Sequence, residues 1–225
     1  MAHPLACPGI ISNTAQVWKE EAANGVPRNF DSGETFSFDG LESADFMYIV
    51  RGAVALNYLE VNGKSKCQLI CRQNTLINEA HIITGQALNK IAYTPLSALE
   101  TLAFSAEKYD RARLYERPDL LFSMAYSQSI KLVHANMLYD AISVRSKLQL
   151  ICWYLLRLSE QHNNSNSFTP EVSQAQMSML LGINHRTFNR YITFLKEEGI
   201  IGRFTKRSLE ITHRERLRLL SEPAD

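Results

Sequence analysis

Four polar side chains near residue 187 have the chemistry that is needed to read base edges in DNA: His185, Arg186, Asn189 and Arg190. Arginine can donate to O6 and N7 of guanine, and asparagine can pair with adenine in the major groove. Their spacing places them together at the start of one helix. The pattern predicts a DNA-reading face, and the alternative is a solvated basic surface on an ordinary helical hairpin.

The residues around these four predict two short helices joined by a tight turn. Each helix has apolar residues at helical spacing that would face inward: Met177, Leu180 and Leu181 in the first, and Phe188, Ile192 and Leu195 in the second. Gly182 supplies the turn, because a residue without Cβ can adopt positive φ. Ile183 fills the corner, and Asn184 can cap the second helix. This is a helix-turn-helix, and Ser173 and Gln174 at its start are further candidate DNA contacts.

Residues 200–211 predict a β-hairpin with a basic tip. Apolar residues alternate on both sides of a turn near Lys206 and Arg207, which is typical of two short strands. A basic hairpin after a helix-turn-helix forms a winged helix. Lys206 and Arg207 are therefore predicted phosphate contacts, which supply affinity without reading sequence.

Charge is unevenly distributed along the chain. Residues 144–225 hold 12 lysines and arginines against 8 aspartates and glutamates, a net charge of +4, whereas residues 1–143 have a net charge of −3. A basic C-terminal third in a nearly neutral chain suits a polyanionic partner, such as DNA, at one end only.

Length and composition favour a globular protein of two domains. The 225 residues are 45% hydrophobic and 21% charged, and this length allows two domains of about 80–140 residues each. No apolar run approaches the roughly 20 residues of a membrane span, and the N-terminus lacks a secretory signal. We therefore expect a cytoplasmic protein with no membrane contact, whose four cysteines are reduced thiols.

Residues 30–104 alternate between short apolar segments and turn signals, which predicts a compact antiparallel barrel or roll. Residues 46–70 are typical of a strand, a bend at Gly52, a second strand, a hairpin turn at Asn62-Gly63 and a third strand. Residues 91–105 predict two more strands.

A long helix is predicted between the two regions, from residue 118 to about residue 140. Residues in it step by alternating intervals of four and three, the heptad pattern of a helix that packs against another helix: Leu121, Ala125, Gln128, Leu132, Ala135, Tyr139 and Ile142. A second copy of the same helix is the simplest partner, which predicts a parallel homodimer. The alternative is packing on the chain's own N-terminal domain. A further helix is predicted from residue 144 to about residue 160.

Together these elements resemble the CRP/FNR regulators, which include the cyclic-AMP receptor protein and the fumarate–nitrate regulators. The resemblance rests on the strand–bend–strand M-Y-I-V-R-G-A-V, the long helix and the L-G-I-N-H-R-T-F-N-R of the helix-turn-helix, and it covers about residues 28–215.

The resemblance implies an α+β fold. An N-terminal antiparallel β-roll (a double-stranded β-helix or jelly roll) would sense an effector over residues 1–116. A dimerisation helix would cover residues 117–143, and a winged helix-turn-helix domain residues 144–225. The resemblance further implies a homodimer that binds a palindromic operator on double-stranded DNA, responds to a small-molecule effector and can contact RNA polymerase.

The family's cyclic-nucleotide cassette is only partly kept. It has a Gly-Glu pair for the ribose and, ten residues after that Glu, an Arg-Ser pair for the phosphate. The matching positions here are Asn78-Glu79 and Asn89-Lys90. Asn89 cannot make the bidentate charged contact that arginine makes with phosphate, although Lys90 could act as a point charge. We therefore expect that the effector is not cyclic AMP.

Haem and redox sensing are alternatives within the same family. Its oxygen-sensing branch needs three cysteines near the N-terminus, where only Cys7 lies. His81 and His134 are the candidate haem ligands, although a lone histidine is more commonly exposed or packed. Cys67 and Cys71 lie on one face of a predicted strand, where they could form a redox pair or join a metal site, although two ordinary strand cysteines are the more common case. No metal ligands are predicted, and the cofactor stays undetermined.

A second resemblance is to the halophenol-responsive regulators of reductive dehalogenation. Their N-S-L-I-G segment is similar to residues 74–78 (N-T-L-I-N), and their recognition helix also begins with a histidine after the turn. This similarity implies a small aromatic or other organic effector in a pocket between the roll and the long helix. The candidate pocket residues are Leu76, Ile77, Glu79, Lys90, Tyr93, Met124 and Gln128.

The recognition helix departs from the CRP/FNR pattern at one base-reading position. The family usually has a glutamate near the start of this helix and an arginine four residues later, and these positions here hold Arg186 and Arg190. Glutamate accepts a hydrogen bond from cytosine N4, which arginine cannot do. The operator is therefore expected to differ from the family consensus at that base pair.

Two other classes of function are not favoured. For an enzyme, the sequence lacks the G-x-S-x-G, H-E-x-x-H, P-loop and dinucleotide-binding fingerprints, and no catalytic residue is predicted. The winged helix predicted at residues 173–211 argues against a ligand-binding regulatory module without its own transcriptional role, because such a module needs no DNA-binding domain.

Overall fold

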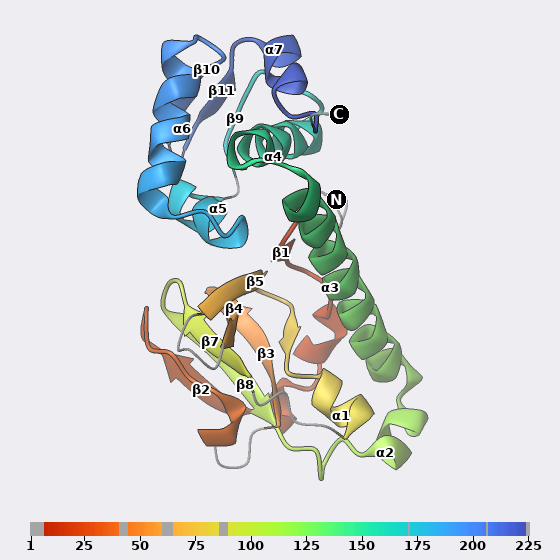
Figure 1. Ribbon diagram of the computed structural model, residues 1–225. Helices are drawn as coiled ribbons and strands as arrows, with labels where there is room; N and C mark the ends of the chain where they lie inside the picture. Colours follow the sequence, from red (N-terminus) through yellow and green to blue (C-terminus); the bar gives the residue numbers. More distant parts are fainter. Residues whose placement is uncertain are drawn as a thin grey trace. The chain divides into compact units, whose positions relative to one another are not determined.

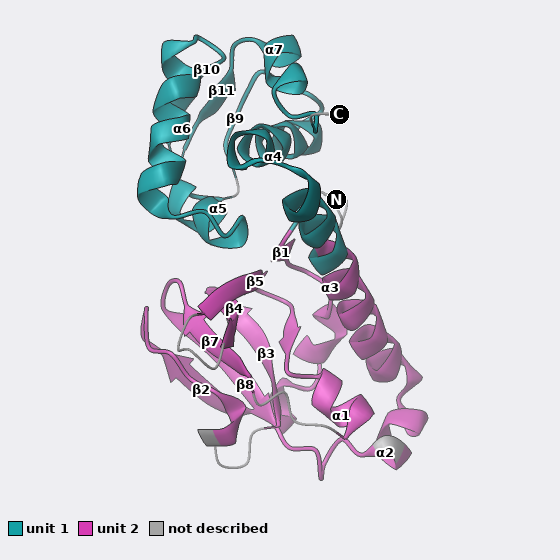
Figure 2. Ribbon diagram, in the orientation of Figure 1, with its two compact units in different colours: residues 1–8, 135–225 teal, residues 9–134 magenta. Residues whose placement is uncertain are grey.

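The structure is a computed structural model that describes residues 7–40, 45–59, 65–85, 90–170, 172–205 and 207–223. The chain divides into two compact units (Figure 2): unit 1 comprises residues 1–8 and 135–225, and unit 2 comprises residues 9–134. Among the described residues, no helix combines the length and the apolar character that crossing a membrane requires.

Unit 2 is built on two four-stranded sheets (Figure 1). One has the order β1 (Ile10–Ile11), β5 (Ser65–Arg72), β4 (Ala53–Leu59) and β7 (Ile91–Pro95), and the other has the order β2 (Val26–Phe30), β8 (Leu99–Phe104), β3 (Phe46–Arg51) and β6 (Leu76–Ile77). Neighbouring strands are antiparallel except β1, which pairs in parallel with β5. The predicted roll is confirmed, whereas β1 was not predicted because two residues are too few to show alternation.

The strands predicted over residues 46–70 and 91–105 are all present. Gly52 joins β3 to β4 with a φ of 99°, a conformation that favours glycine. β4 and β5 pair from Leu59 opposite Ser65 onwards, as a hairpin requires, while Asn62-Gly63 itself lies outside the described residues.

The core of unit 2 is rich in aromatic side chains and includes Trp18, from the segment between β1 and β2. Trp18, in the short helix η1 (Gln16–Lys19), is fully buried, with its ring centroid 5.2 Å from Phe46 and 5.3 Å from Phe104. Leu120 and Met124 belong to the same cluster. This role of Trp18 was not predicted, because its segment is too short and irregular to show helix or strand periodicity.

The long helix α3 spans Pro118–Val144 and has two different faces. One face is a row of buried residues at intervals of four and three: Leu120, Met124, Ser127, Lys131, His134, Leu138 and Ala141. The predicted seam lies one residue further along, and none of its seven members is buried. Leu132 and Tyr139 within it are 62% and 70% exposed.

Unit 1 combines helices with a small antiparallel sheet. The helices are α4 (Lys147–Gln161), α5 (Gln174–Leu180), α6 (His185–Glu197) and α7 (Arg214–Leu219), and the sheet has the order β10 (Ile201–Phe204), β11 (Leu209–Ile211) and β9 (Ser167–Phe168). α4 begins three residues later than predicted, because Ser146 and Gln149 form a capping box there and Val144 belongs to α3.

Candidate nucleic-acid interface and effector region

The helix-turn-helix forms as the sequence predicts. The six residues predicted to face inward from α5 and α6 are all buried, and so is Ile183 at the corner. Gly182 has a φ of 62°. Asn184 caps α6, since its Oδ1 accepts a hydrogen bond from the backbone N–H of Arg186 at 3.0 Å.

The first turns of α6 present the four candidate base readers together. His185, Arg186 and Arg190 are exposed, and Asn189 is half-buried. Asn189 Nδ2 lies 3.3 Å from His185 Nδ1. The Arg190 guanidinium lies beside the ring of Tyr191, 5.5 Å from its centroid. Cationic and amide donors thus gather at the end of the helix that would enter a major groove.

The predicted wing is also present. β10 and β11 pair with Ile201 opposite Ile211 and Phe204 opposite Leu209. Arg207 is exposed at the turn, where its backbone N–H donates to Thr205 Oγ1 at 3.2 Å. Lys206 lies outside the described residues. The strand β9, which was not predicted, pairs with β11 and completes the sheet.

Ser173 and Gln174 hold the motif together within the chain itself. Ser173 Oγ accepts a hydrogen bond from the N–H of Gln176 at 3.2 Å and so caps α5. Gln174 Nε2 donates to the carbonyl of Phe204 at 2.8 Å, which ties the start of α5 to the wing strand β10. If these two residues also contact DNA, they must do so while keeping these hydrogen bonds within the domain.

Part of the positive charge of the C-terminal third is neutralised or hydrogen-bonded inside unit 1. Arg214 Nη2 donates to Ser159 Oγ and to the Asn164 carbonyl, both at 2.6 Å. Arg216 forms an ion pair with Glu198 at 2.8 Å. The number of cationic side chains available to a DNA partner is therefore smaller than the net charge of this region indicates.

In unit 2, Glu79 is fully buried and forms an ion pair with a residue of α3. Its Oε1 accepts hydrogen bonds from Lys131 Nζ at 2.5 Å and from Ser127 Oγ at 2.7 Å. Lys131 Nζ also donates to the Leu76 carbonyl at 2.7 Å. Two charges can be buried together only when they are paired and hydrogen-bonded in this way. Glu79 was predicted from the sequence, but Lys131 was not. The one feature of the sequence that points to Lys131 is a charged residue within the buried row of α3, which has the same spacing of four and three as the predicted seam.

The other predicted effector residues have different surroundings. Leu76, Ile77, Tyr93 and Met124 are buried, and Gln128 is half-buried. Burial, followed by the charge of Glu79, holds the pKa of Tyr93 well above its ordinary value. Lys90 is exposed with its ammonium 5.9 Å from the centroid of the Tyr58 ring, and Asn89 lies outside the described residues. The cation that meets Glu79 is thus Lys131 and not Lys90.

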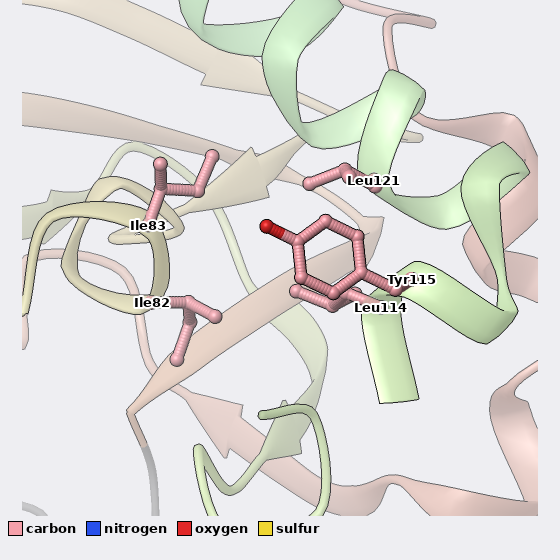
Figure 3. A pocket seen from close by; sticks show the side chains of 5 residues that line it. All are labelled: Ile82, Ile83, Leu114, Tyr115 and Leu121. Atoms are coloured by element: carbon pink, nitrogen blue, oxygen red, sulfur yellow. The ribbon is translucent and has the colours of Figure 1, made fainter. Parts of the chain in front are cut away.

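An open apolar pocket of about 240 Å³ lies in the same unit (Figure 3). Its walls come from α1 (Ala80–Thr84), α2 (Arg111–Glu116) and the start of α3: Ile82, Ile83, Leu114, Tyr115 and Leu121. None of these is among the predicted effector residues, because side chains from three separate helices meet here only after folding.

The four cysteines are buried, and the two candidate haem ligands contact other groups of the protein: His81 Nε2 lies 3.6 Å from Asp45 Oδ1. Burial raises the pKa of Cys67 and of Cys71 to about 12, and a buried, protonated thiol reacts slowly, which disfavours a redox pair. His134 is buried, and its Nδ1 accepts a hydrogen bond from the N–H of Gly9 at 3.0 Å. Within the described ranges, no three histidine, cysteine or acidic side chains are grouped as a metal site.

Comparisons with known proteins match this architecture. The family model of the Crp-like helix-turn-helix domain matches residues 149–220. The global nitrogen regulator of Synechocystis sp. is 23% identical over 194 residues, which cover 83% of this chain and 84% of that protein. Residues 149–220 thus form a Crp-like helix-turn-helix domain, and the chain is similar to CRP/FNR-type transcription regulators over most of its length.

Solved structures show that this chain shares its fold with distant proteins. CprK complexed with OCPA superposes with a TM-score of 0.75 at 17% identity, covering 94% of this chain and 97% of CprK. A CooA mutant from Carboxydothermus hydrogenoformans superposes with a TM-score of 0.74 at 12% identity, covering 94% and 96%. At such identities the likeness concerns the fold alone.

Proposed function

We propose that this chain is a CRP/FNR regulator that binds a palindromic operator as a homodimer and responds to a small-molecule effector in the cytoplasm. Residues 1–116 would sense the effector, residues 117–143 would dimerise, and residues 144–225 would bind DNA and bring the complex to RNA polymerase. The cluster of His185, Arg186, Asn189 and Arg190 on the first turns of α6 carries this function, because such donors fit base edges in the major groove.

A mobility-shift experiment with random duplex DNA tests the DNA-binding function. We expect a shift at low salt that weakens steeply as salt rises, because cationic contacts with phosphates release counterions. An enzyme, or a regulatory module without a transcriptional role, would give no shift at any salt concentration.

The homodimer is supported by the two faces of α3. The buried row satisfies one face within the chain, while the predicted seam keeps large apolar side chains such as Leu132 and Tyr139 exposed. A second α3 packed in parallel would cover them. Two identical half-sites one helical turn apart would follow from the two-fold symmetry of such a dimer.

Placing aspartate at both Leu132 and Ala135 should convert the dimer to a monomer, because like charges would be buried against each other at the seam. Sedimentation velocity measures the change in mass. Leu219→Asp is the matched control, since Leu219 on α7 is 70% exposed and lies off α3. A dimer that survives both aspartates would place the interface elsewhere.

Cyclic AMP should give no binding isotherm in calorimetry at micromolar concentrations. Asn89 replaces the phosphate-binding arginine of the family, and Lys131 already engages the Glu79 carboxylate. The cyclic-AMP receptor protein serves as the positive control. A clear micromolar isotherm would contradict this expectation and would give Lys90 the role of the arginine.

A small aromatic or other organic effector is the proposed alternative to a nucleotide. The apolar surroundings of Leu76, Ile77, Tyr93 and Met124, with one buried charged pair beside them, suit such a molecule. Native mass spectrometry and an absorption spectrum of the purified protein test this class. A haem or iron–sulfur cluster retained by the purified protein would contradict the proposal of an organic effector and would favour haem or redox sensing.

A further inference from the structure

We propose that the pocket between α1, α2 and α3 receives Phe122 of the partner subunit in the homodimer. This contact depends on the homodimer proposed above and assigns it a specific pair of surfaces. Each copy would contribute one pocket and one phenylalanine, so the interface is self-complementary, as two-fold symmetry requires.

The pocket has the chemistry and the size for a phenyl ring. Its walls are Ile82, Ile83, Leu114, Tyr115 and Leu121, with no charged side chain among them (Figure 3). An apolar cavity of about 150 Å³ is enough to bind benzene, and this pocket measures about 240 Å³. Tyr115 is 75% exposed, so the pocket leaves apolar surface in water unless something covers it.

Phe122 is an exposed aromatic side chain next to this pocket in sequence. It is 71% exposed on α3, although the residue before it, Leu121, is a pocket wall. Its ring stacks on Tyr126 one turn further along, with centroids 6.4 Å apart and the planes 15° from parallel. The ring is therefore held on the exposed surface of α3, where a partner subunit can reach it.

Helix geometry brings the two features together in a parallel dimer. Consecutive residues are about 100° apart around a helix. Leu121 belongs to the seam, its pocket extends from the seam toward the buried row and toward α1 and α2, and Phe122 lies on the other side of the seam. A two-fold axis parallel to the helices sets the pocket side of the seam in one copy beside the Phe122 side of the seam in the other, at about the same level. The pocket at Leu121 therefore faces the partner's Phe122, and not a second pocket.

Cross-linking of two singly substituted full-length chains tests the contact. All four native cysteines are buried, so they give little background. Ile83→Cys and Phe122→Cys chains with different affinity tags are co-expressed, purified over both tags and treated with a short bis-maleimide. We expect a covalent heterodimer between the two tagged chains, at a yield well above that of Val50→Cys with Phe122→Cys.

Leu132→Cys separates failure of this contact from failure of the homodimer. If Leu132→Cys chains cross-link to each other while the Ile83→Cys and Phe122→Cys pair does not, the dimer stands and the pocket contact is wrong. If neither pair cross-links and sedimentation gives the mass of a monomer, the homodimer fails and the pocket contact with it.

Dimer affinity gives a second measurement. Phe122→Ala should raise the dissociation constant of the dimer about tenfold or more, whereas Phe194→Ala on α6 should leave it unchanged. Binding of anilinonaphthalene sulfonate to the dimer, abolished by Ile83→Trp, would instead assign the pocket to a free aromatic ligand and overturn the proposal.

Discussion

Arg190→Ala is expected to weaken binding of the dimer to its cognate operator by about 1–3 kcal/mol in each half-site. Over two half-sites this is a loss of roughly one and a half to four orders of magnitude in affinity. Arg190 is exposed on the second turn of α6, where a guanidinium can donate to both O6 and N7 of one guanine. Fluorescence anisotropy at fixed salt, with cognate and random duplexes, measures the loss and the change in specificity.

Two control variants isolate base reading from charge. Arg190→Lys keeps the charge but loses the bidentate geometry, so it should retain binding to random DNA and lose specificity. Lys206→Ala in the wing should weaken all sequences alike and reduce the salt slope by about one for each subunit, or about two for the dimer. If Arg190→Ala weakened cognate and random DNA by the same factor, Arg190 would be a phosphate contact and not a base reader.

Lys131→Met is expected to destabilise unit 2 by about 3–5 kcal/mol, which is the usual cost of removing one partner from a buried ion pair. The Glu79 carboxylate has no exposed surface, and the variant would leave its charge without the Lys131 ammonium. Replacing both residues together, with Glu79→Leu and Lys131→Met, removes both charges and should recover most of the loss.

Urea unfolding can report on unit 2 alone. The two tryptophans, Trp18 and Trp153, lie in different units, so Trp153→Phe leaves Trp18 as the single fluorescent reporter in the core of unit 2. The midpoint should fall markedly for Lys131→Met and much less for the double variant. Equal midpoints for Lys131→Met and its parent would mean that the pair contributes nothing to stability.

The sequence by itself determined the winged helix almost completely. The apolar spacing of α5 and α6, the turn at Gly182 and the cap at Asn184 act over a few residues, so a local pattern suffices to predict them. The same holds for β3, β4 and β5, whose alternation and turn signals are also local.

Contacts between distant residues were decided only by the tertiary structure. Trp18 enters the core from an irregular segment, β1 pairs with a strand about sixty residues away, and Lys131 meets Glu79 from a different element. No local periodicity encodes such meetings, because they depend on how the sheets and α3 pack.

The long helix α3 was determined partly by its local sequence and partly by tertiary packing. Its sequence contains two rows at intervals of four and three, one residue apart, and either could be taken for a seam. Local spacing determined that α3 is a helix with two packing faces. Only tertiary packing, which buries the row from Leu120 to His134 within unit 2, decided which face of this part of α3 stays exposed, because burial depends on the elements that pack against the helix and not on the helix itself.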